Sequence, residues 1–141
     1  MTFRRILAQS AVSDLHIAER WYSILFEGPP HARPMDGLLE WHLAPTFGVQ
    51  VWRDADRAGR SCMVLDESDL DALAARLTAA GLAHDGPQQA TSSRVLVLAD
   101  PDGNRVVATG PSSPSGRQGA RDGASAGADG APVPQREHPG P

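Results

Sequence analysis

The sequence of 141 residues contains no lysine, a single cysteine and no long apolar run. A lone cysteine, Cys62, excludes an intrachain disulfide and a cysteine-based zinc site, because both need at least two thiols. No segment reaches the ~18 consecutive apolar residues of a membrane-spanning helix. The first residues also lack the apolar stretch of a signal peptide. We therefore expect a cytoplasmic protein that does not enter a membrane.

The sequence also lacks a basic cluster. Its formal net charge is −4, and its 13 basic residues, all arginine, are scattered along the chain. Proteins that bind nucleic acid carry concentrated positive charge to neutralise phosphates. The sequence therefore predicts no nucleic-acid partner.

Large aliphatic residues are scarce in the last part of the chain, residues 111–141, which is rich in Gly, Pro and Ala. Such a segment cannot bury enough apolar surface to offset the entropy lost on ordering, so we expect it to be disordered. Residues 1–110 are long enough for one domain with its own core.

Within residues 1–110 one order of elements occurs twice, once over about residues 1–56 and again over about 60–110. Each half reads strand, helix, strand, strand, strand, with Ser13 and Ser68 as expected helix N-caps. In the first half the expected elements are strand 3–12, helix 14–26, edge strand 31–35, and strands 38–43 and 47–53. In the second half they are strand 61–65, a helix from Ser68 to Gly81, a weak strand 83–88, and strands 94–99 and 105–109.

Alternation along two strands of the first half separates an apolar face from a mixed face. The apolar face consists of Leu39, Trp41, Leu43, Phe47, Val49 and Val51. The mixed face consists of Leu38, Glu40, His42, Gly48, Gln50 and Trp52. We expect the apolar face to lie under the helices. The mixed face then lines either a small-molecule pocket or simply solvent.

Two motifs resemble one known family. Ala11-Val12-Ser13-Asp14, followed by the run from Ala18 to Phe26, resembles its opening strand–helix motif, and Asp100-Pro101-Asp102-Gly103-Asn104 resembles its last hairpin turn. This is the vicinal oxygen chelate superfamily, which includes glyoxalase I, bleomycin-resistance proteins and extradiol dioxygenases. The resemblance implies an α+β fold with two β-α-β-β-β modules. Their mixed sheets would curl into a cup, with the helices on the outer face and the cup usually completed by dimerisation.

The resemblance also says where metal ligands would stand, namely on the first and last strand of each module. These positions fall on Leu7, Gln50, Cys62 (or Ser61 after a slip of one residue) and Val107. Leu7 and Val107 have no lone pairs, Gln50 is a weak neutral ligand and Cys62 would be a lone soft one. A catalytic divalent site needs about three protein ligands. We therefore expect no metal and no other cofactor.

The resulting hypothesis is a metal-independent protein of the glyoxalase and bleomycin-resistance type, a homodimer that binds a small organic molecule and sequesters a drug or metabolite. Trp52 would stack on the ligand, and Gln50 and His42 would orient it. Glu40 would suit a cationic ligand, whereas Arg105 would suit an anion. The expected ligand-binding residues are Gln9, Glu40, His42, Gln50, Trp52, Cys62 and Arg105.

Two alternatives stay open, and no residue is assigned a catalytic role. Glu40 and His42 share a face, so they could perform metal-independent acid–base chemistry of the lyase or isomerase type. The domain could instead be a structural dimerisation module without a ligand. The Asp100–Asn104 motif itself reads as a tight hairpin turn, because Pro101 and Gly103 supply the backbone angles of such a turn.

Overall fold

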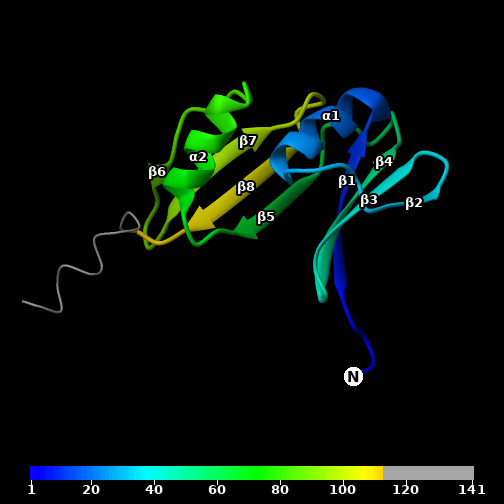
Figure 1. The fold of residues 1–141 in the computed structure, drawn as a ribbon, viewed down its shortest axis with the longest axis horizontal. Helices are drawn as coiled ribbons and strands as arrows, with labels where there is room; N and C mark the ends of the chain where they lie inside the picture. The colour runs from blue at the N-terminus through cyan, green and yellow to red at the C-terminus, as the bar shows by residue number, and fades with distance from the viewer. Residues whose placement is uncertain (113–141) are drawn as a thin grey trace, which may run out of the picture.

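The structure, a computed structural model, describes residues 1–112. The disorder expected for residues 111–141 concerns a segment that, from residue 113 on, lies outside the described part. Within the described part, two β-α-β-β-β modules follow each other along the chain (Figure 1). This confirms the α+β fold expected from the sequence.

Module 1 is a four-stranded sheet with one helix. Its elements are β1 (Ile6–Val12), α1 (Leu15–Leu25), β2 (Ala32–Met35), β3 (Leu38–Ala44) and β4 (Phe47–Arg53). The strand order is β1-β4-β3-β2, with β1 parallel to β4 and the other pairs antiparallel. The first strand is three residues shorter than expected, and the helix is one residue shorter at each end.

Module 2 repeats this plan. Its elements are β5 (Cys62–Asp66), α2 (Leu70–Ala79), β6 (Gln88–Gln89), β7 (Arg94–Ala99) and β8 (Arg105–Gly110). The strand order is β5-β8-β7-β6, and β5 runs parallel to β8. The expected strand 83–88 was mostly wrong, because only Gln88 and Gln89 pair with β7. Gly86 has a φ of +79°, which ends extended structure before this short strand begins.

Both helices are capped by aspartate, one residue later than expected. Asp14 accepts a hydrogen bond from the Ile17 N–H, and Asp69 accepts one from the Ala72 N–H, so the expected caps Ser13 and Ser68 were wrong. An aspartate at this position satisfies a free N–H and also complements the helix dipole.

The spacing of the large apolar residues in α1 favours burial of the side that carries Ile17, Trp21 and Ile24. The side that is buried lies one residue further along the chain. Ala18, Tyr22 and Leu25 are buried, whereas Ile17 is 48% exposed and Trp21 only partly covered. The reason for this shift is the hydrogen bonding of Tyr22. The Tyr22 hydroxyl reaches two partners inside the molecule, and that position is reached only if the helix turns Tyr22 inward.

The apolar strand face lies under the helix, as expected. Leu39, Trp41, Val49 and Val51 are at most 1% exposed and join one core with residues of module 2. Residues of the same strand face that lie beyond the end of the helix are less covered, and Phe47, one of them, is 47% exposed. The opposite face of the sheet carries no helix.

The hairpin turn Asp100–Asn104 joins the two modules. The Asn104 side-chain amide donates to the Ala11 carbonyl (2.7 Å), and the Ser61 hydroxyl accepts from the Ala11 N–H (3.0 Å). Tyr22 donates to the Asp100 carboxylate (2.8 Å), which also accepts from Asn104. Burial, the largest cause, raises the pKa of Tyr22 far above its usual value. The turn is therefore an inter-module joint as well as a chain reversal.

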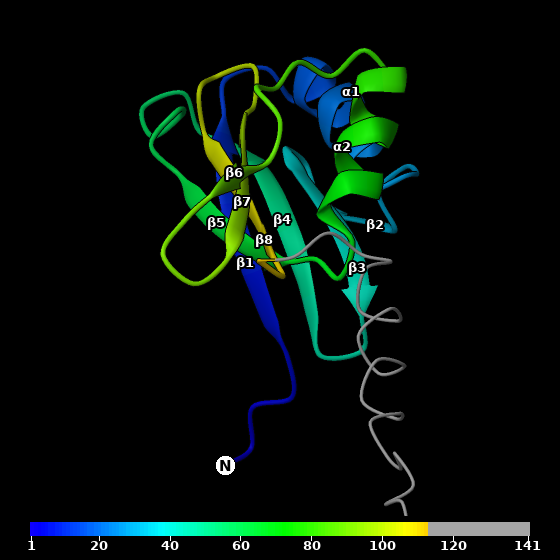
Figure 2. The same cartoon turned by 90° about the vertical axis from the view of Figure 1, so that its left-hand side faces the viewer.

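A second joint links the helices, which lie near each other in both views (Figure 2). The Arg76 guanidinium of α2 donates to the carbonyls of Ile24 and Leu25, both at 2.8 Å. These carbonyls belong to the last turn of α1 and have no partner within that helix. Arg76 thus caps the helix of the other module.

Candidate functional site

A line of polar side chains crosses the uncovered face of the module 1 sheet. Gln9 on β1 lies opposite Gln50 on β4, and Gln50 lies opposite Glu40 on β3. Gln9 Nε2 donates to Gln50 Oε1, and Gln50 Nε2 donates to Glu40 Oε2, both at 2.8 Å. His42, two residues further along β3, places Nε2 2.6 Å from Glu40 Oε1. We call Gln9, Gln50, Glu40 and His42 the carboxylate relay.

Glu40 is the buried centre of this relay. Its side chain is 7% exposed, although it lies on the face that no helix covers. The hydrogen bond from Gln50, and next that from His42, hold the pKa of the Glu40 carboxyl below its usual value despite its burial. A carboxylate can stay charged in such a place because its oxygens receive hydrogen bonds.

Histidine and arginine side chains surround this carboxylate. The ring of His42 stacks on that of His31 with centroids 5.5 Å apart, and His31 Nδ1 accepts the backbone N–H of His42 (3.0 Å). Arg5 Nη2 lies 3.8 Å from Glu40 Oε1, and the Arg5 side chain is 48% exposed. Sequence reasoning missed Arg5 and His31 as site residues, although both fall within the expected strands 3–12 and 31–35; in the structure each lies just before the strand that follows it.

The structure divides the expected ligand-binding residues into two groups. The relay and Trp52 share the uncovered face of module 1, and Trp52 lies opposite Ala11 and Leu38. Cys62 and Arg105 lie opposite each other on β5 and β8 of module 2. The two groups therefore lie on separate sheets.

The strand registers relate the four positions where the resemblance places metal ligands. Leu7 lies opposite Gly48, two residues before Gln50, and Cys62 lies opposite Arg105, two residues before Val107. Leu7 and Gln50 in module 1 are therefore related in the same way as Cys62 and Val107 in module 2. Cys62, not Ser61, thus corresponds to Leu7. Leu7 and Val107 offer only hydrocarbon, and the Gln50 amide is bonded at both ends. Within residues 1–112, no three His, Cys, Asp or Glu side chains are grouped so that they could hold a metal.

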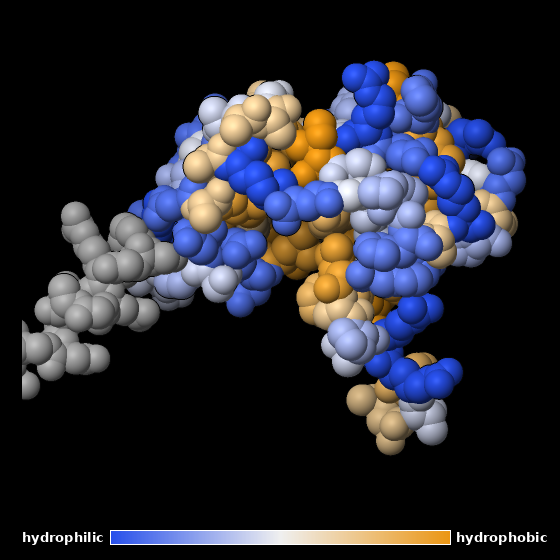
Figure 3. Space-filling view, in the orientation of Figure 1, coloured by the Kyte–Doolittle hydropathy of each residue, from blue (hydrophilic) through white to orange (hydrophobic). Residues whose placement is uncertain are grey.

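Sequence reasoning also missed an apolar groove of about 920 Å³ between the modules. It is lined from module 1 by residues such as Ile6 and Phe47, and from module 2 by residues such as Val64 and Leu98. Figure 3 shows apolar side chains gathered between the two modules. Most of the groove lining lies on the helix side of the two sheets and includes Leu73 and Arg76 of α2, and β1 and β5 are edge strands beside the groove.

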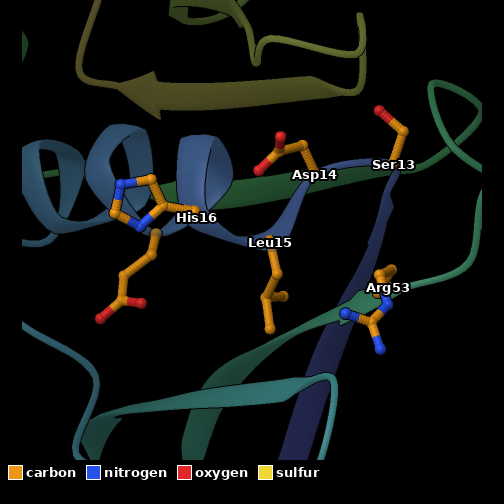
Figure 4. Close-up of a pocket in the computed structure, with 6 residues that line it drawn as sticks. Ser13, Asp14, Leu15, His16 and Arg53 are labelled. Carbon is orange, nitrogen blue, oxygen red and sulfur yellow. The ribbon is translucent and has the colours of Figure 1, made fainter.

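A smaller recess of about 440 Å³ lies at the start of α1 and includes Asp14, His16 and Arg53 (Figure 4). Its side chains do not converge, since those of Asp14 and Arg53 point in opposite directions. Asp14 caps the helix, and Arg53 reaches Asp36 at 3.5 Å. The recess is therefore a less suitable site than the relay.

No helix among residues 1–112 is long and apolar enough to cross a membrane. Residues 8–108 match the family model described as Glyoxalase/Bleomycin resistance protein/Dioxygenase superfamily. No curated protein shows a significant match to the chain.

Solved structures share the fold. A glyoxalase/bleomycin resistance protein from Catenulispora acidiphila has a TM-score of 0.70 and 24% identity, covering 75% of this chain and 96% of its own. An antibiotic binding protein, TnmS3, from Streptomyces sp. CB03234 has a TM-score of 0.66 and 27% identity, covering 79% of this chain and 98% of its own. A glyoxalase/bleomycin resistance protein from the same Streptomyces has a TM-score of 0.62 and 26% identity, covering 74% and 98%.

Proposed function

The chain belongs to the Glyoxalase/Bleomycin resistance protein/Dioxygenase superfamily, and from this premise we propose that it binds a small organic molecule without the metal of the family's enzymes. One observation carries the proposal. The uncovered face of module 1 holds a bonded polar relay beside a partly exposed tryptophan, and two of the positions that the resemblance assigns to metal ligands, Leu7 and Val107, carry hydrocarbon side chains. Such a face can orient and stack a ligand but offers a divalent cation too few ligands. Sequestration of a drug or metabolite is the role that follows.

Metal independence is tested by elemental analysis. Protein purified without chelators and then dialysed should hold far less than one equivalent of zinc, nickel, iron or manganese. Ligand binding should be unchanged after treatment with EDTA. Stoichiometric metal, or binding that EDTA abolishes, would contradict the proposal.

The neighbour described as an antibiotic binding protein supports the choice of ligands to screen. A panel of aromatic antibiotics is tested by the shift each produces in the melting temperature. We expect Trp52→Ala to remove the shift of any hit, and Trp52→Phe to keep most of it, because Phe can still stack. Phe47→Ala is the matched control, since Phe47 is an aromatic residue of the same strand that points to the opposite face. A hit that is weakened by Phe47→Ala and not by Trp52→Ala would place the ligand elsewhere.

We also propose that the protein is a homodimer. β1 and β5 are both edge strands beside the apolar groove, and a two-fold axis would let each pair with the opposite edge of a second copy. Sedimentation should show a dimer, and Val64→Asp, in the groove wall, should shift it toward monomer. A wild-type monomer at all concentrations would rule this out.

One observation favours a second candidate, a metal-independent lyase or isomerase. The 2.6 Å contact between His42 Nε2 and Glu40 Oε1 is the arrangement in which a carboxylate orients an imidazole for proton transfer. Turnover of a bound ligand that His42→Gln abolishes without weakening its binding would establish this activity. A structural dimerisation module is favoured instead if no ligand of any class binds.

A cytoplasmic location agrees with the free, exposed thiol of Cys62, because reducing compartments preserve such thiols.

A further inference from the structure

The hydrogen bonds of the carboxylate relay have a fixed direction, which the buried carboxylate of Glu40 sets. An ionised carboxylate can only accept hydrogen bonds. Gln50 must therefore turn its NH₂ group toward Glu40, which leaves its carbonyl oxygen to accept from Gln9. Glu40 thus orients the Gln50 amide, and Gln50 orients the Gln9 amide. Gln9 is the last residue of the line, and its Nε2 already donates to Gln50.

The same reasoning fixes the proton on His42. Its Nε2 faces a carboxylate oxygen at 2.6 Å and must carry the hydrogen. In the neutral imidazole the other nitrogen, Nδ1, is then an acceptor. With His42 neutral, the relay ends in two acceptors, Gln9 Oε1 on one side and His42 Nδ1 on the other, and both residues are exposed.

A negative charge lies beneath these acceptors. Glu40 is ionised and 7% exposed, so water screens its charge less than that of a surface carboxylate. The nearest arginine, Arg5, stands at 3.8 Å, too far for a hydrogen bond, and comes from the exposed segment before β1. Arg5 acts here as a loosely held counter-ion that another cation could replace.

From this geometry we propose that the ligand is an organic cation with several N–H donors on an aromatic or apolar body, such as a protonated amine, an amidinium or a guanidinium. The inference rests on the proposed binding function and specifies its ligand class. The cationic group lies over the relay and donates to Gln9 Oε1 or to His42 Nδ1, the acceptors at its two ends, while the body lies against Trp52. Trp52 also favours a cation, because an aromatic face attracts positive charge.

This assignment separates two roles that the sequence left in conflict. Glu40 lies at the centre of a bonded network, whereas Arg105 lies on the other sheet, exposed and opposite Cys62. An anion at Arg105 would therefore leave the relay without a role. Selection by the relay favours the cation.

The test uses three probes with one aromatic body and different charge, namely 4-phenylbenzamidine, 4-phenylbenzamide and biphenyl-4-carboxylate. Binding to the full chain is measured by calorimetry. We expect the amidine to bind about tenfold or more tightly than the amide, because hydrogen bonds from a charged donor are stronger than those from a neutral amide. The carboxylate should bind more weakly than the amide.

Three variants locate the effect. Glu40→Gln should bring amidine affinity down to that of the amide while leaving amide affinity nearly unchanged. Arg5→Gln should raise amidine affinity, because it removes the competing cation, and as a change at an exposed position it should leave the fold intact. Asp36→Asn is the matched control, since it neutralises a fully exposed carboxylate of the same module and should alter neither affinity.

The outcomes distinguish the two proposals. Equal affinity for the three probes, or a preference for the carboxylate, would overturn the cation inference and leave small-molecule binding standing. Amidine preference that survives Glu40→Gln and is unaffected by Arg5→Gln would also overturn it, because the charge selection would then lie outside the relay. If none of the three probes bound, the cation inference would be overturned, and the antibiotic panel would decide separately whether the binding function stands.

Discussion

The two modules share one backbone plan but differ on their uncovered faces. In module 1 the central row across three strands is Gln9, Gln50 and Glu40. The equivalent row in module 2 is Val64, Val107 and Val97. The registers place these rows at matching positions, so a bonded polar line in one sheet corresponds to three valines in the other.

This difference shows which positions the fold constrains. The helix-covered face is apolar in both modules, because the core must exclude water from it. The opposite face is not constrained in this way, and the modules use it differently. Val64 is 62% exposed and Val97 42% exposed, which is a costly surface for a chain that stays alone.

The largest effect is expected for the Asp100–Asn104 turn, whose inter-module hydrogen bonds have no counterpart in the shorter turn of module 1. Asp100→Ala should destabilise the protein by about 3 kcal/mol, because it removes the buried carboxylate that accepts hydrogen bonds from both Tyr22 and Asn104. In module 1 the corresponding turn carries Thr46, and Thr46→Ala should cost less than about 0.5 kcal/mol. Urea unfolding of both variants measures the contrast. Similar losses in the two would show that the Asp100 turn is no special joint.

A second variant copies the module 2 row into module 1. The triple change Gln9→Val, Gln50→Val and Glu40→Val removes three of the four relay residues and leaves only the exposed His42 without its partner, so the cost should be about 1–2 kcal/mol. Binding of the amidine probe should be lost. Circular dichroism and calorimetry check the fold and the binding. Retained amidine binding by the folded variant would separate the relay from the ligand.

The pH dependence of stability should also differ between the modules. Hydrogen bonds from Gln50 and His42 hold the pKa of Glu40 below its unfolded value, which is about 4.5, so its contribution is present above that pH and lost as the pH falls through the folded value. The stability difference between wild type and Glu40→Gln should therefore shrink on acidification below about pH 4.5.

Asp71 of module 2 provides the comparison. Its pKa is also lowered, by hydrogen bonds from Arg94, but its side chain is 47% exposed. Solvent screens such a pair, so Asp71→Asn should show a weaker pH dependence than Glu40→Gln. Urea unfolding between pH 3 and 7, with both variants in the same buffers, measures the two curves. An equal or steeper dependence for Asp71→Asn would contradict the difference in burial.

The smallest effect is expected on the valine row. Val97→Ser should change the free energy of unfolding by about 0.5 kcal/mol or less, since the side chain is partly exposed and fills no cavity. Thermal unfolding is the measurement. A loss of several degrees would show that this face is covered in solution.

Much of the fold could be predicted from the sequence because it follows from local rules. Alternation placed Trp41 and Val51 under the helix and Glu40 and Gln50 on the other face, and the structure agrees. The helix caps were predicted one residue early, since Ser13 and Asp14 are both good caps and local preference does not choose between them. Tyr22 was not expected to be buried in preference to Trp21, because its partners Ser10 and Asp100 come from other elements.

The site depends on pairing between distant segments, which no local pattern specifies. The alternation of strand residues determined which side chains share a face, and the two motifs determined the family. Only the tertiary structure decided that Gln9 meets Gln50, 41 positions away, and that Asn104 bonds to Ala11, 93 positions away. Periodicity is a property of neighbours along the chain. Register and the contact between modules are set by packing across it.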